Sequence, residues 1–146
     1  MDKKEFNKIT KEEFLEYGFI KRRETFVLIL DEITIDCRLY TWNYVRSFNY
    51  WLSINALHDD SEPYEKRTDV YCCVKMKHSP SAEGYHSSEI KYEEYTEDQY
   101  RNMLKYMLHF YFDPYKQDAI HHINENIMID LKPKAADFLG VNGPKS

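Results

Sequence analysis

The sequence predicts a single α+β domain: an antiparallel sheet of about four to five strands, with a short N-terminal helix and two C-terminal helices packed on it. Three observations support this prediction. The chain of 146 residues is long enough to bury one substantial core. Strand-like alternation fills its middle, and helical spacing of apolar residues fills its last third. We expect the domain to span residues 1–140, and residues 141–146 to form a frayed tail.

The first element is predicted to be a short helix over residues 11–17. Thr10 has the residue type of an N-cap, and Glu13 follows at the third helical position, which is the spacing of a capping box. Gly18 then stands where a left-handed residue commonly ends a helix.

The stretch from residue 25 to residue 40 is the most strand-like in the chain. Residues 26–30 are continuously apolar, and apolar and polar residues alternate over residues 33–40. A single strand of this length would reach ~50 Å at ~3.3 Å per residue, which is too long for a small domain. We therefore predict two strands with a bend or turn at Asp31 and Glu32.

Further strands are expected before the C-terminal helices. Residues 42–57 alternate like a strand but also contain a helical apolar stripe, and we favour the strand. Residues 69–78 read as a strand, and residues 85–95 as its partner. Because the link between them is short and rich in turn residues, we expect antiparallel pairing.

The C-terminal third predicts two helices. Thr96 and Gln99 form a second capping box, and an apolar stripe follows at helical spacing. Asp113 and Pro114 should end this helix and begin another, which continues to about residue 130.

The composition restricts the function more than any motif does. Four glycines and no glycine-rich loop argue against Rossmann and P-loop enzymes. A net charge of −5 disfavours nucleic acid as the main ligand, but it permits a protein partner with a basic surface. The three cysteines, the lack of a leader and the lack of a long apolar run predict a cytoplasmic protein with reduced thiols and no membrane contact.

Acidic residues interleaved with tyrosine suggest a surface that binds such a partner, because the composition suits docking on a basic groove. The leading interpretation is a non-enzymatic protein-binding module, in its sharper form a small acidic inhibitor or immunity-type protein acting on a basic nucleic-acid-processing enzyme. The residues predicted to bind the partner are Asp59, Asp60, Tyr64, Tyr92, Glu93, Glu94, Tyr95, Glu97 and Asp98.

Two alternatives stay open. Asp69, Glu89 and Lys91 have the order of a metal-dependent phosphodiesterase, with two carboxylates for a divalent ion and a lysine beside the attacking water. Acidic-x-Lys triplets are common by chance in a chain this charged. The other alternative is a small-ligand protein with an aromatic pocket, whose candidate lining residues are Trp42, Tyr44 and Trp51.

The histidines do not predict a metal site. His109 and Asp113 are one helical turn apart, and a helical hairpin could bring His109 near His121 or His122. Metal sites require three or four ligands with an orienting shell, and no histidine motif supplies that set. We therefore predict neither a metal nor a cofactor.

Overall fold

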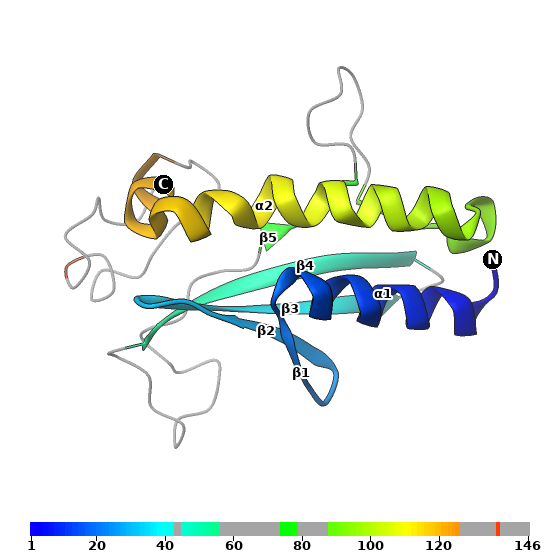
Figure 1. Ribbon diagram of the computed structural model, residues 1–146, viewed down its shortest axis with the longest axis horizontal. Coiled ribbons are helices and arrows are strands. Elements are labelled where there is room, and N and C mark those ends of the chain that lie inside the picture. The colour runs from blue at the N-terminus through cyan, green and yellow to red at the C-terminus, as the bar shows by residue number, and fades with distance from the viewer. Residues whose placement is uncertain (43–44, 56–73, 79–87, 126–136, 138–146) are drawn as a thin grey trace.

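The computed structural model describes residues 1–42, 45–55, 74–78, 88–125 and 137. It is an α+β fold in which two helices cover one face of a five-stranded antiparallel sheet (Figure 1). The predicted class, the N-terminal helix and the antiparallel sheet are thereby confirmed. The elements are α1 (Lys3–Tyr17), β1 (Ile20–Arg22), β2 (Thr25–Ile29), β3 (Ile33–Trp42), β4 (Val45–Ile54), β5 (Val74–Lys75), the 3₁₀ helix η3 (Tyr92–Glu94) and α2 (Glu97–Glu125).

The strands follow one another in the sheet in chain order, so each strand pairs with its neighbour in the sequence. The predicted turn between β2 and β3 is confirmed, and the backbone N–H of Leu30 donates to the carbonyl of Ile33 there, at 2.9 Å. The side-chain amide of Asn55 also donates to the carbonyls of Leu30 and Asp31, at 2.7 and 3.1 Å. The strand interpretation of residues 42–57 is confirmed over β4.

One face of the sheet forms the core with both helices. Alternate residues of paired strands share this face, for example Cys37 with Phe26 on one side and Tyr50 on the other. Phe14 of α1 packs between Phe26 and Phe48, with ring centroids 4.3 and 5.3 Å away. Phe112 of α2 packs on Tyr50 at 5.2 Å. Burial raises the pKa of the Cys37 thiol, which keeps it protonated and unreactive.

Helix α1 begins eight residues earlier than the sequence predicts. Asp2 is its N-cap, and Asp2 and Glu5 form the capping box, with N–H to carboxylate distances of 2.8 and 3.2 Å. The capping box predicted at Thr10 is wrong, because Thr10 lies inside the helix and its hydroxyl donates to the carbonyl of Phe6 at 2.7 Å. The predicted end at Gly18 is confirmed, with a φ of 126° that glycine adopts readily.

The start of α2 agrees with the prediction, but the predicted break within it does not. The Thr96–Gln99 capping box is present, at 3.0 and 3.1 Å. The predicted break at Asp113 and Pro114 is wrong, because the helix continues through the proline. The non-helical residue is Asp118, whose carboxylate accepts from the N–H of His121 at 3.1 Å, as an N-cap does. A separate second helix is not seen in the described residues, and residues 126–136 lie outside them.

The strand predicted over residues 85–95 is wrong for residues 88–95, and residues 85–87 lie outside the described part. The chain there forms an irregular segment and then η3. A backbone hydrogen bond joins the segment to β4, from the N–H of Ile90 to the carbonyl of Arg46, at 2.8 Å. Ile90 and Tyr92 both face the core at the spacing of a strand, but the chain must turn here to begin α2. Of the predicted strand over residues 69–78, the structure describes residues 74–78 and shows β5 there.

Candidate acidic interface

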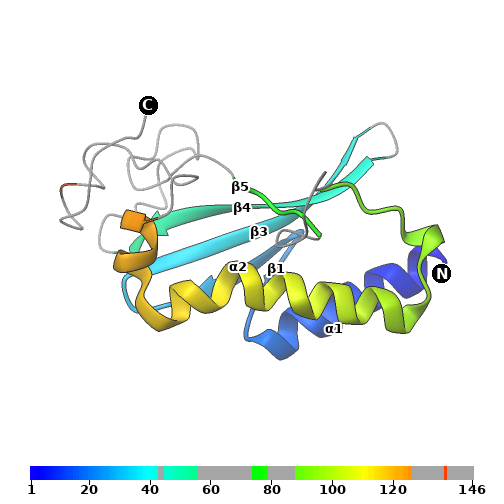
Figure 2. The ribbon, with the colours of Figure 1, turned by 90° about the horizontal axis from the view of Figure 1, so that it is seen from above.

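The N-termini of the two helices meet at one end of the molecule. Helices α1 and α2 run parallel and side by side, and both begin at the end where the chain starts (Figures 1 and 2). The terminal amine of Met1 donates to the carbonyl of Tyr95 at 3.0 Å, which joins the two starts. The positive ends of both helix dipoles therefore lie together and favour carboxylates. We call the following residues the acidic end: Asp2, Glu5, Glu93, Glu94, Glu97 and Asp98.

Four predicted residues of the acidic end are exposed and have no ion-pair partner among the described residues. Glu93 and Glu94 lie on η3, and Glu97 and Asp98 lie in the first turn of α2. None of the four makes an ion pair with another described residue. By contrast, Glu13 in the middle of α1 is paired with two cations. The charge at the acidic end is therefore available to a partner.

The two tyrosines predicted to share this surface belong mainly to the core. Tyr92 is 9% exposed and stacks on Phe6, with ring centroids 5.1 Å apart. The guanidinium of Arg46 covers the same ring at 4.4 Å. Tyr95 is half-buried and packs against the core. The acids are therefore the part of the predicted surface that a partner can contact, while Asp59, Asp60 and Tyr64 lie outside the described residues.

Two residues of the phosphodiesterase alternative, Glu89 and Lys91, do not lie on a strand. Glu89 is half-buried and Lys91 is exposed, and both lie on the irregular segment before η3. Asp69 lies outside the described residues. Among the residues that are described, no three His, Cys, Asp or Glu side chains gather closely enough to hold a metal ion.

The two tryptophans of the predicted pocket lie far apart along the β3–β4 hairpin. Trp42 pairs with Val45, whereas Trp51 pairs with Asp36. On β3 these two pairs are six residue steps apart, from Asp36 to Trp42, which corresponds to ~20 Å at ~3.3 Å per residue. Trp51 instead contacts Tyr40, with ring centroids 5.9 Å apart. Tyr44 lies outside the described residues.

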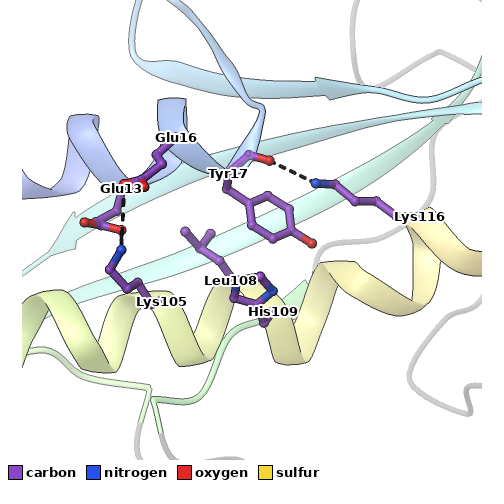
Figure 3. Close-up of a pocket in the computed structure, with 7 residues that line it drawn as sticks. All are labelled: Glu13, Glu16, Tyr17, Lys105, Leu108, His109 and Lys116. Atoms are coloured by element: carbon purple, nitrogen blue, oxygen red, sulfur yellow. Dashed lines mark hydrogen bonds and ion pairs between the residues drawn. The ribbon is translucent and has the colours of Figure 1, made fainter.

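A polar pocket between the two helices was missed by the sequence analysis. Its volume is about 260 Å³ (Figure 3). Glu13 is 3% exposed, and its carboxylate oxygens lie 2.6 Å from Arg101 and 3.2 Å from Lys105. The signal was present, because acidic residues at 12, 13 and 16 on one helix match basic residues at 101 and 105 on the other. The lining residues are Glu13, Glu16, Tyr17, Lys105, Leu108, His109 and Lys116.

At the far end of this pocket, Asp113 accepts hydrogen bonds from Tyr17 and His109. Partial burial acts to raise the pKa of Asp113, but these two hydrogen bonds and the charges of His109 and Lys116 outweigh it, so the pKa is lowered. Burial, followed by the contact with Asp113, raises the pKa of Tyr17. Lys116 lies 3.7 Å from the Tyr17 ring centroid and donates to the Tyr17 carbonyl at 2.9 Å.

The polar contacts of the pocket join α1 to α2. Lys105 pairs with Glu13 and Glu16, and opposite charges balance across the lining, so the pocket presents little net charge to a ligand. His109 pairs with Asp113 at 2.9 Å, which uses the imidazole Nδ1. The predicted approach of His109 to His121 or His122 is not among the contacts of the described residues. The lining contains no serine, threonine or cysteine, and the hydroxyl of Tyr17 donates to Asp113.

Comparisons with protein-family models, with curated proteins and with solved structures found no match for this chain. In the part of the chain that the structure describes, no helix combines the length and apolar character needed to cross a membrane.

Proposed function

We propose that the protein is a non-enzymatic binding module whose acidic end docks on a basic surface of a partner protein. The observation that supports this is the set of exposed carboxylates on η3 and the first turn of α2, which lack counter-charges among the described residues. Opposite charge on a partner would speed the encounter and fix the orientation of docking.

In its sharper form, the proposal names the partner as a basic enzyme that processes nucleic acid, met in the cytoplasm. Such an enzyme binds phosphates with lysine and arginine, and a rigid group of carboxylates can occupy the same cations. The acidic end is rigid because the capping boxes and the Met1–Tyr95 bond hold both helix starts. The net charge of −5 adds a long-range attraction. Binding would then inhibit the enzyme.

The experiment uses tagged protein to capture partners from lysate of its source cells. One variant, Glu93→Gln with Glu94→Gln, removes two charges from the acidic end. The control, Glu12→Gln with Glu16→Gln, removes two charges from exposed residues of α1, which are 44% and 70% exposed. We expect the protein to capture one dominant partner, and the binding should be lost at high salt. The first variant should lower the affinity about tenfold or more, and the control should not.

The captured protein is then assayed for nucleic-acid processing with and without this chain. Inhibition that the first variant loses and the control keeps supports the inhibitor form. Equal capture by all three proteins, or capture that survives high salt, would contradict docking through the acidic end.

A further inference from the structure

A positively charged groove lies between α1 and the core face of the sheet. Its volume is about 470 Å³, within the range of ~300–1,000 Å³ typical of small-molecule sites. Four cations and one carboxylate line it, in a protein whose net charge is −5. The lining residues are Lys3, Asn7, Thr10, Lys11, Lys21, Glu24, Phe26, Leu39, Thr41 and Arg46.

The four cations make no ion pair with any described residue. Two of them are held over aromatic rings instead: Arg46 over Tyr92 at 4.4 Å, and Lys21 near Phe26 at 5.9 Å. Like charges that share a concave surface repel one another and raise its positive potential. An anion in the groove would relieve this repulsion.

The cations stand in two pairs, one at each end of the groove. Phe6 of α1 stacks on Tyr92, the ring that Arg46 covers, so the start of α1 lies at the Arg46 end. Lys3 belongs to this end. Phe14 stacks on Phe26 at 4.3 Å, and Phe26 pairs with Lys21 in the sheet. The second half of α1 therefore lies at the Lys21 end.

The helix sets the spacing of the two pairs. Lys11 lies in the half of α1 that approaches Lys21, eight residues after Lys3. Eight helical residues correspond to ~12 Å at ~1.5 Å per residue. On the sheet, Lys21 is in register with Tyr50, so Arg46 lies three strands away and four residues along β4, or ~14 Å across and ~13 Å along the strands. Both walls thus separate their cations along the groove, and the sheet does so by more than the helix.

The rest of the groove is polar on its walls and partly apolar on its floor. Asn7 and Thr41 are exposed and can donate and accept hydrogen bonds. Phe26 and Leu39 supply the apolar floor, and Glu24 can accept from a hydroxyl group. An uncharged body that carries hydroxyl groups fits this lining.

We propose that this groove binds an elongated small molecule with a phosphate group at each end and a hydroxyl-bearing body between them. A phosphate monoester carries a charge of about −1.5 to −2 at pH 7, which matches the two cations at each end. Side chains supply the contacts, so the site needs none of the glycine-rich backbone that the sequence lacks. The proposal is independent of docking at the acidic end.

The test compares fructose 1,6-bisphosphate with fructose 6-phosphate by titration calorimetry at fixed ionic strength. The variant Lys11→Gln with Lys21→Gln removes one cation pair, and Lys4→Gln with Lys8→Gln removes two exposed charges of α1 that do not line the groove. We expect the wild-type protein to bind the bisphosphate about tenfold or more tightly than the monophosphate, because the second phosphate adds charge-assisted hydrogen bonds.

The groove variant should lower the affinity for the bisphosphate to that for the monophosphate, while the control variant leaves it unchanged. Chemical shift changes on titration should centre on Asn7 and Thr41. The absence of saturable bisphosphate binding would overturn the proposal. So would equal affinities for the two sugars, or an equal loss in the groove and control variants, which would indicate non-specific attraction.

Discussion

Glu13 provides the sharpest test of how the two helices are joined. Its side chain is 3% exposed, and its carboxylate contacts Arg101 at 2.6 Å and Lys105 at 3.2 Å. The two cations are 32% and 44% exposed, so they can turn toward water when the carboxylate is removed. The Glu13 carboxylate is buried, so it cannot turn toward water when the cations are removed. The cost of breaking this cluster should therefore depend on which partner is changed.

We expect Glu13→Gln to lower the free energy of unfolding by about 1–2 kcal/mol, the loss of hydrogen bonds to a charged group whose cationic partners become hydrated. Arg101→Met with Lys105→Met should cost more, about 3–5 kcal/mol, because it leaves a carboxylate buried without either cation. Glu12, which also contacts Arg101, is 44% exposed and adds little.

Urea unfolding followed by circular dichroism measures the free energy of unfolding of both variants. For an m-value of about 2 kcal/mol/M, the double methionine variant should lose about 2 M in its midpoint, and Glu13→Gln less than about 1 M. The order of the two values is the critical result. A double variant that loses no more than Glu13→Gln would refute the view that Arg101 and Lys105 hold a buried charge.

Two further predictions concern α2. Because hydrogen bonds lower the pKa of Asp113, its contribution to stability is present above its ordinary value of 3.8 and is lost as the pH falls below it. Tyr17→Phe removes one of these bonds, so NMR titration should show a higher pKa for Asp113, and stability should fall less on acidification; an unchanged pKa would contradict the contact. Pro114→Ala should raise the free energy of unfolding by about 1–3 kcal/mol in thermal unfolding, because it restores an N–H to the carbonyl of Phe110; a loss of stability would show that the proline shapes the helix.

Features that depend on residues close in the sequence were predicted well. The β2–β3 turn followed from the change of pattern at Asp31 and Glu32, and the start of α2 followed from Thr96 and Gln99. The start of α1 shows the limit of this reasoning. Two segments, Asp2–Glu5 and Thr10–Glu13, have capping-box spacing, and the apolar residues Phe6 and Ile9 extend the helix back to the first.

The parts that failed depend on contacts between distant residues. Tyr92 has the sequence context of an exposed acidic surface, yet Phe6 and Arg46 bury its ring. The polar pocket joins residues about ninety apart, such as Glu13 and Arg101, and no local pattern selects that pairing. Glu93, Glu94, Glu97 and Asp98 are exposed, as the predicted surface requires, and the start of a helix favours acids at the last two.

The order of the strands has a consequence for how the chain folds during synthesis. Each of β1 to β4 finds its hairpin partner among residues made just before or after it, so these pairings can close while the chain leaves the ribosome. Helix α1 is made first, but the Tyr100 hydroxyl and the Arg101 guanidinium of α2, which contact its Thr10 and Glu13, follow about ninety residues later. A nascent chain that stops before α2 leaves the apolar face of the sheet half-covered, and such a chain should engage chaperones until the last helix docks.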